Sequence, residues 1–213
     1  TDTLTDTGAD ITADITAEIT AEITAETSDS QACNGHLALC SRRFDEVAYV
    51  TTHNAMANKA DGFIGPNQTE DIPTQLADGV RGLMLDIHVD QGEVVLCHGY
   101  CALGRVPLVE GLGQIRDFME AEPREVLTIL FETYVSNDET GAAFVAAGLE
   151  DMLHAQIIGQ PWPTLEEMIT SGRRLVVFTD YQSETYPWLH RTWDHCFDTD
   201  WAAETLADFS CDR

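Results

Sequence analysis

The sequence predicts an α/β protein, because segments with strand and helix character alternate along the chain from Cys33 onward. Residues 82–90 alternate between apolar and polar side chains, as a half-buried strand does. Residues 108–119 instead repeat their apolar side chains at helical spacing. The runs at 125–135 and 175–180 are almost continuously apolar, which is typical of strands buried on both faces of a parallel sheet. Together these patterns favour a parallel sheet with helical connections.

The first 30 residues lack this pattern and are expected to form a separate acidic spacer. An acid occurs at every fourth position inside an ITAE repeat, and no basic residue balances it. Like charges four residues apart repel along a helix face, and Thr and Ile are mediocre helix formers. We therefore predict a disordered spacer over 1–30 and one folded domain over 31–213. A calcium-loaded repeat is the alternative, but the repeat lacks the glycines that sharp calcium loops use.

The folded part is predicted to begin with a strand at 47–52, followed by a two-faced strand at 82–90. The next strand, 93–99, follows after Asp90-Gln91-Gly92, which is too short for a helical crossover and so predicts a tight turn between adjacent strands. In the strand at 82–90, alternation places Leu83, Leu85, Ile87 and Val89 on one face, and Met84, Asp86, His88 and Asp90 on the other.

Three helices are predicted between the later strands. The first stops before Pro123, and the third begins at a capping-box pattern of Thr164 and Glu167 and closes at Gly172. The apolar positions that mark the first two helices are Leu108, Leu112, Ile115 and Met119, and then Val145, Leu149 and Met152.

The length after the spacer is short for a complete eight-stranded α/β barrel. Such a barrel takes roughly 250 residues or more, and 31–213 is shorter than that. Either the barrel is short or the chain stops before its last strands. The first residue is Thr, so we also expect the natural amino terminus, with any secretion signal, to lie upstream.

Six cysteines fall into three pairs that are close in sequence, and none of the pairs has zinc-ribbon spacing. This pattern favours disulfides and an extracellular or periplasmic location. Buried free thiols in a cytosolic enzyme are the alternative. The expected disulfides are Cys33 with Cys40, Cys97 with Cys101, and Cys196 with Cys211.

The formal charge of −26, from 37 acidic and 11 basic residues, excludes some partners. Nucleic acid is not expected to bind such a chain. Tight docking on anionic lipid is not expected either, because basic residues supply that attraction. Peripheral contact with a neutral membrane stays open, and no apolar run is long enough to predict a transmembrane helix.

Polar side chains that a core would reject stand at the carboxyl ends of the predicted strands. In an α/β barrel this rim is where active sites form. A single strand-end histidine is more often structural than catalytic, but several such groups together favour a site. The residues are His53, Asn54, Asp86, His88, His98 and Glu132.

Four segments, in this order and spacing, resemble the X domain of phosphatidylinositol-specific phospholipases C and related bacterial proteins. They are THNAMAN, QLADGVRGLMLDIH, LCHGYCALG and EVLTILFETYV, and the resemblance runs from about Cys33 to about residue 180. It implies a TIM-barrel-like fold, incomplete at the carboxyl terminus if strands are missing. It also implies a secreted phosphodiesterase that acts on a phospholipid or on a soluble inositol phosphodiester.

The resemblance assigns the catalytic roles to two histidines. In the family one histidine removes a proton from the inositol 2-hydroxyl, which attacks phosphorus, and another protonates the departing lipid oxygen. His53 matches the first and His98 the second. Imidazole titrates near neutrality, so the pair suits both ends of such a displacement.

The resemblance also implies a cation site. Calcium-using members place an amide and carboxylates where this chain has Asn54, Asp86 and Glu132, and these oxygen ligands suit Ca²⁺ or Mg²⁺. His88 departs from the pattern, because relatives have a carboxylate or an arginine there, and it is expected to stabilise substrate charge instead. Arg81 either contacts phosphate or pairs with a carboxylate. Asp180 is a loose candidate for the carboxylate that orients the first histidine.

Three other functions remain open at this stage. A metal-dependent glycerophosphodiester or sphingomyelinase-D-like phosphodiesterase would share the rim, but its substrate would lack the internal inositol nucleophile. A catalytically silent binding module on the same fold is a second alternative. An acidic adhesive protein, with the spacer as its functional part, is a third. The sequence leaves the head group and the oligomeric state open.

Overall fold

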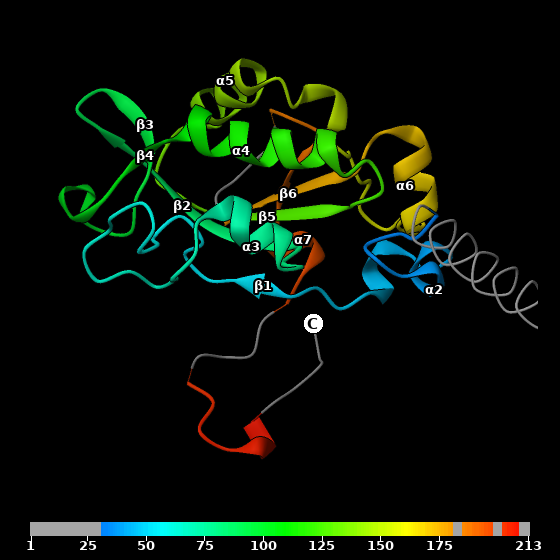
Figure 1. The fold of residues 1–213 in the computed structure, drawn as a ribbon. Helices are drawn as coiled ribbons and strands as arrows, with labels where there is room; N and C mark the ends of the chain where they lie inside the picture. The colour runs from blue at the N-terminus through cyan, green and yellow to red at the C-terminus, as the bar shows by residue number, and fades with distance from the viewer. Residues whose placement is uncertain (1–30, 181–184, 198–201, 209–213) are drawn as a thin grey trace, which may run out of the picture.

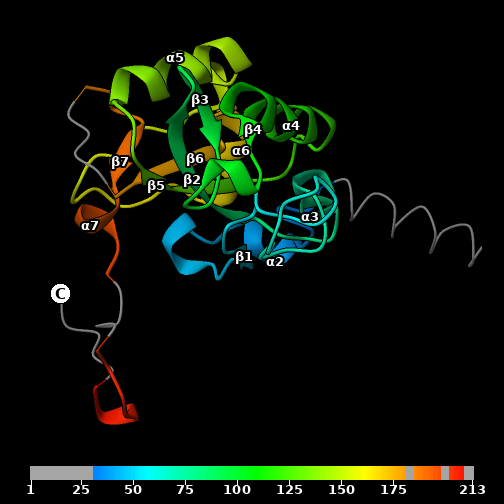
Figure 2. The same cartoon turned by 90° about the vertical axis from the view of Figure 1, so that its left-hand side faces the viewer.

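The computed structural model describes residues 31–180, 185–197 and 202–208, and the predicted spacer over 1–30 lies outside these residues. The described residues form an α/β domain with one seven-stranded sheet. The predicted fold class is confirmed, with a sheet that is curved like part of a barrel but does not close within the described residues (Figures 1 and 2).

Five strands of the sheet run parallel and two form an antiparallel extension at one side. The parallel strands are β1 (Thr51–Thr52), β2 (Gly82–Asp90), β5 (Leu127–Thr133), β6 (Leu175–Thr179) and β7 (Leu189–Arg191). The antiparallel pair is β3 (Glu93–Leu96) and β4 (Val106–Pro107). The predicted tight turn between β2 and β3 is confirmed, with Gln91 and Gly92 both at positive φ.

β2 lies in the middle of the sheet and pairs with three strands, β1, β3 and β5. One of its edges pairs with β5 from Gly82 to Ile87. Its other edge pairs first with β1, at Gly82 and Leu83, and then with β3, from Ile87 to Asp90. β1 therefore ends alongside Leu83, near the start of β2, and the chain that follows it bonds to β2 again where the Ala55 amide donates to the Met84 carbonyl.

The short β1 is close to β2 because Gly82 has no side chain. A Cβ atom added at Gly82 would lie 2.2 Å from the Thr51 hydroxyl oxygen. The predicted strand at 47–52 is confirmed only at its last two residues, Thr51 and Thr52. Val50 nevertheless contacts β2, since its carbonyl accepts hydrogen bonds from the amides of Arg81 and Gly82.

Helices cover the outer face of the sheet. α3, α4 and α5 lie side by side there, and α2 and α6 lie together at one end (Figure 1). The α-helices are α2 (Leu37–Cys40), α3 (Ile72–Ala77), α4 (Leu108–Ala121), α5 (Asn137–Ala147), α6 (Leu165–Ser171) and α7 (Thr192–His195). The 3₁₀ turns are η1 (Phe44–Glu46), η2 (Cys101–Leu103), η3 (Glu150–Met152) and η4 (Leu206–Asp208).

The alternation predicted for β2 decides which side chains reach the core. Leu83, Leu85 and Ile87 are fully buried in the main hydrophobic cluster beneath the helices. Val89 is exposed near the end of the strand, where the hairpin leaves the sheet. Met84, on the opposite face, is 37% exposed because the sheet does not close over it. The inner face of the sheet is thus free to form a cavity.

The predicted position of the second helix was wrong. α5 begins at Asn137 after a capping box formed by Ser136 and Glu139, and ends where Gly148 adopts φ 75°. Met152 lies beyond it in η3. The buried face of α5 consists largely of Gly and Ala with Phe144, so its apolar periodicity is weak in the sequence. The first and third predicted helices are confirmed as α4 and α6, including the Thr164 capping box and Gly172.

Two of the three expected disulfides are present. Cys33 bonds to Cys40 and Cys97 bonds to Cys101. The third expected pair involves Cys211, which lies outside the described residues. Within the described ranges, no helix has the length and apolar character needed to cross a membrane.

Replacement of Gly82 by Ala should destabilise the domain. The added methyl group would overlap Thr51 and force β1 away from β2. Overpacking of this kind costs about 1–3 kcal/mol. Urea unfolding should show a lower midpoint for Gly82→Ala. Gly113→Ala, in the interior of α4, should match or exceed the wild type, because the nearest atom to its added Cβ is an Arg116 nitrogen at an ordinary 3.9 Å. Equal midpoints for Gly82→Ala and wild type would show that β1 is not held at this contact.

Acid should destabilise the domain through His190. This side chain is 4% exposed, and its Nε2 faces the His154 carbonyl at 3.1 Å and the Gln156 amide at 3.4 Å. Burial lowers the pKa of His190 to about 4. Since unfolded histidine titrates near 6.5, the folded state resists protonation and its stability should fall as pH drops from about 6.5 to about 4.

The His190→Gln variant isolates this effect. Wild type should lose on the order of 2 kcal/mol more unfolding free energy across that range than the variant, which has no group to titrate there. His154 and His195, whose pKa values burial also lowers, remain in both proteins. Parallel curves of unfolding free energy against pH would contradict a neutral, buried His190.

Candidate active site

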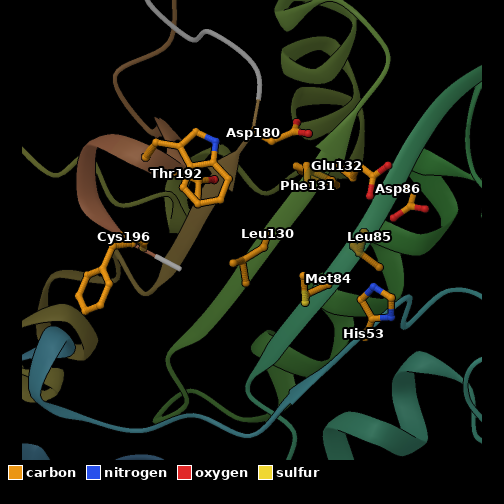
Figure 3. Close-up of a pocket in the computed structure, with 12 residues that line it drawn as sticks. His53, Met84, Leu85, Asp86, Leu130, Phe131, Glu132, Asp180, Thr192 and Cys196 are labelled. Carbon is orange, nitrogen blue, oxygen red and sulfur yellow. The ribbon is translucent and has the colours of Figure 1, made fainter. Parts of the chain in front are cut away.

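The carboxyl ends of the parallel strands surround a cavity of about 310 Å³. Met84 and Leu130, from adjacent positions of β2 and β5, contribute apolar walls, and Trp193 and Phe197 contribute more. Figure 3 shows three acidic side chains at the upper side of this cavity and His53 below them. Asp86 lies in the middle of β2 and Glu132 near the end of β5, whereas His53 and Asp180 come just after β1 and β6.

Asp86 and Glu132 form the centre of the cluster. They are direct partners in the β2–β5 register, so their side chains lie on the same face, and Figure 3 shows them side by side. Asp86 is 4% exposed, and its carboxylate accepts no hydrogen bond from the described residues. Burial, and then repulsion from Glu132, raises the pKa of Asp86 to about 6. Two carboxylates placed so close, one of them buried, favour a bound cation.

His53 and His98 approach this carboxylate pair from two separate loops. His53 directly follows β1, and its carbonyl accepts a 2.7 Å hydrogen bond from the Gln68 side chain. His98 lies in the loop after β3. Both side chains are exposed, and both act on Asp86 electrostatically, where they partly offset the raised pKa. Solvent access and proximity to one carboxylate fit a pair of proton-transfer groups.

Asn54 is held beside the same strand by its backbone. Its φ of 50° turns the chain sharply, and the next residue donates a hydrogen bond from its amide to the Met84 carbonyl at 3.0 Å. The side chain is 2% exposed and its amide nitrogen lies 3.4 Å from the Asn67 oxygen. Asn tolerates this left-handed conformation better than most residues. The turn therefore keeps Asn54 beside β2 directly after the end of β1.

Tyr134 is a site residue that sequence reasoning missed. Its hydroxyl donates a hydrogen bond to Glu132, and its ring stacks on His88 with centroids 4.3 Å apart. The Glu132 contact raises the pKa of Tyr134 to about 12. Burial lowers the pKa of His88, which favours a neutral imidazole at pH 7. The available signal was position: Tyr134 follows Glu132 by two residues, so an extended chain places both on one face.

Arg81 does not join the cluster. It precedes β2 and therefore lies at the opposite end of the strand from Asp86 and His88. Its guanidinium bonds to Glu125 at 2.6 Å and to the carbonyls of Leu76 and Val80. Of the two roles that the sequence left open, the structure shows the pairing with a carboxylate. The substrate contact expected for Arg81 is not supported, because these bonds occupy the guanidinium far from the cavity.

Asp180 lies in the cavity but is not seen to orient His53. Its carboxylate accepts a 2.8 Å hydrogen bond from the Thr133 amide, which fixes it at the end of β6. No hydrogen bond joins Asp180 to His53 among the described residues. Its charge makes a minor contribution to the raised pKa of Asp86. Asp180 thus adds to the negative character of the rim.

The oxygen ligands at the rim fit a hard cation in part. Asp86 and Glu132 supply two neighbouring carboxylates, and Asn54 supplies an amide near them. Asp86, buried without a hydrogen bond from the described protein groups, is the ligand that most needs a positive partner. Elsewhere in the described chain, Cys33, Cys40 and Glu166 cluster within 4.8 Å, but the two sulfurs form a disulfide and are not thiolate ligands.

Comparison with known proteins identifies the family of the chain. Residues 39–213 match the PI-PLC X domain family model. A PI-PLC X domain-containing protein of Arthroderma benhamiae is 33% identical over 187 residues, which is 81% of this chain and 59% of that protein. A protein of the same fungus named as an uncharacterized secreted protein is 30% identical over 87% of this chain and 43% of its own length. The chain thus spans about half the length of these curated relatives.

Solved structures show the same fold. A phosphatidylinositol-specific phospholipase C of S. aureus, studied for its membrane binding, aligns with a TM-score of 0.54 at 15% identity, over 71% of this chain and 53% of that one. PLC21 of L. pealei aligns with a TM-score of 0.53 at 15% identity, over 68% of this chain and 19% of that one. With a family model that matches most of its length, the chain belongs to the PI-PLC X domain family.

Proposed function

We propose that the protein is a secreted phosphodiesterase that cleaves an inositol-type phosphodiester by acid and base catalysis at His53 and His98. One observation carries the proposal: two exposed histidines from different loops act electrostatically on the Asp86 carboxylate, and His53, Asp86 and Glu132 line one cavity. The family supplies the substrate class. The disulfides and the secreted relative support the location.

In the proposed reaction His53 accepts the proton of the inositol 2-hydroxyl as that oxygen bonds to phosphorus. The bond from phosphorus to the lipid oxygen breaks, and His98 gives its proton to that oxygen. The products are a cyclic inositol phosphate and a neutral alcohol, so the protons and electron pairs balance. Each histidine of this kind contributes roughly 10²–10⁴-fold to the rate.

Asn54, Asp86 and Glu132 are the proposed ligands of a divalent cation, Ca²⁺ or Mg²⁺. When bound, the cation would offset the negative charge that develops on the phosphate oxygens. Tyr134 orients Glu132 through its hydroxyl, and His88 is proposed to contact the substrate at the same rim. The cavity walls, with Met84, Leu130 and Trp193, would exclude water from the reacting phosphate.

Substrate comparison separates this proposal from its rivals. Turnover of phosphatidylinositol but not sphingomyelin would favour the inositol substrate, whose internal hydroxyl is the nucleophile. The reverse preference would favour the glycerophosphodiester or sphingomyelinase-D-like reaction. Absence of turnover with every phosphodiester tested would leave a binding module on the same fold.

The two histidines should respond differently to the leaving group. His98→Ala should slow cleavage of an inositol phosphate with an alkyl leaving group by about 10²–10⁴-fold, because an unprotonated alkoxide departs poorly. With an acidic phenol as leaving group, the same variant should recover most of its activity. His53→Ala should stay slow on both substrates, because the nucleophile must be formed whatever departs.

Steady-state rates on both substrates measure this contrast. His36, an exposed histidine before α2 and outside the cavity, offers a matched control in which His36→Ala should behave as wild type. Equal defects of the two active-site variants on both substrates would contradict the division of roles.

Removal of the cation should lower activity, and Asp86 should be required for its return. Few carboxylates hold the ion, so its binding should be weak and reversible. EDTA should therefore reduce the rate of the wild type, and added Ca²⁺ should restore it. Asp86→Asn should lose this response. Asp117→Asn, which changes an exposed carboxylate on α4, should keep it. Full activity of the wild type in EDTA would contradict a cation in the reaction.

A further inference from the structure

His98 lies inside a small loop that a disulfide closes. Cys97 and Cys101 are joined, and His98, Gly99 and Tyr100 are the three residues between them. Cys97 is fully buried, and its amide donates a 3.2 Å hydrogen bond to the Asp86 carbonyl. The start of the loop is thus fixed directly to the residue at the centre of the site.

The far end of the loop is fixed as well. The Leu103 carbonyl accepts a 2.7 Å hydrogen bond from the Ile64 amide. Gly104 packs so closely on the Phe63 ring that a Cβ atom there would lie 2.4 Å from it. The chain on both sides of the loop is therefore anchored, by β3 at one end and by residues 63 and 64 at the other.

The side chains in the middle of the loop have no such anchors. His98 and Gly99 are exposed, and Tyr100 is 81% exposed. The His98 imidazole makes no hydrogen bond or ring contact with the described residues. Its position consequently depends on the backbone, and the covalent link between Cys97 and Cys101 is what restricts that backbone.

We propose that the Cys97–Cys101 disulfide is the positioning element of the general acid, holding His98 within reach of the departing oxygen. The inference rests on the proposed function. A proton donor must come within about 3 Å of the atom that it serves, and a displacement of about 1 Å can cost on the order of 10²-fold in rate. An open loop of three exposed residues samples many conformations, and the disulfide removes most of them.

The other disulfide provides a matched control. Cys33 and Cys40 also lie close in sequence, but their disulfide is near the amino end of β5, away from the rim. Asn34, next to Cys33, accepts a hydrogen bond there from the Val126 amide. Removal of this disulfide perturbs the fold without touching the loop of His98.

The test compares two substrates that differ in their need for an acid. The Cys97→Ala/Cys101→Ser variant should cleave an inositol phosphate with an alkyl leaving group about 10–100-fold more slowly than wild type, and one with a phenol leaving group less than about 3-fold more slowly. The ratio of the two rates in one sample does not depend on the folded fraction. Cys33→Ala/Cys40→Ser should keep the wild-type ratio.

A double-mutant cycle shows whether the disulfide acts through His98. In the His98→Ala background, loss of Cys97 and Cys101 should change the ratio no further. A further change there, or equal losses on both substrates in the first variant, would overturn the inference. If the variant does not fold, the ratio is measured before and after phosphine reduction on folded Cys33→Ala/Cys40→Ser/Cys211→Ser protein, which also lacks the expected bond of Cys196 with Cys211. A selective fall in the alkyl rate supports the inference, and an unchanged ratio overturns it.

The two proposals fail in different ways. A wild-type protein that cleaves neither substrate would overturn the proposed function, and the inference with it. An active wild type whose rate ratio is unchanged by removal of Cys97 and Cys101 would overturn the inference alone.

Discussion

The parallel pairing of β2 with strands on both of its edges is the constraint on which the rest of the structure depends. At Gly82 the strand contacts β5 on one side and β1 on the other, and only a residue without a side chain lets Thr51 approach. The β2–β5 register that starts at Gly82 places Glu132 opposite Asp86. His53 and Asn54 follow the end of β1 and lie beside the same part of β2. Backbone hydrogen bonds of the sheet therefore bring the site residues together.

The electrostatics of the cavity follow from this pairing. Direct register partners cannot move apart without breaking the sheet, so Asp86 and Glu132 repel each other in a fixed arrangement. The chain has many more acidic than basic residues, and Arg81, at the opposite end of β2, already pairs with Glu125. Under the proposed function, a solvent cation is thus the positive group that meets a phosphate at this rim.

Much of this arrangement could be predicted from sequence, and the reasons lie in strand geometry. Period-two alternation in 82–90 separated the core face from the face that carries Asp86, and apolar runs located β5 and β6. α5 was misplaced because its buried face is made largely of Gly and Ala, which give little periodic signal. Tyr134 was missed because its role depends on a hydroxyl that reaches Glu132 and a ring that meets His88, and neither contact is visible in a linear pattern. The position of Arg81 before β2 already places it at the end opposite the rim, but its partner Glu125 lies 44 residues further along the chain, and a linear pattern does not show that pairing.

Both disulfides of the described chain join cysteines that are near neighbours in sequence, with separations of 7 and 4 residues. Neither bond ties together elements from distant parts of the chain, so the hydrophobic core can assemble while all the thiols are still reduced. Each of these cysteines also has its native partner as the nearest thiol along the chain, and small loops close with the least entropic cost. Oxidative maturation of this domain should therefore proceed without a disulfide isomerase to correct mispaired bonds, even when oxidation precedes the completion of folding.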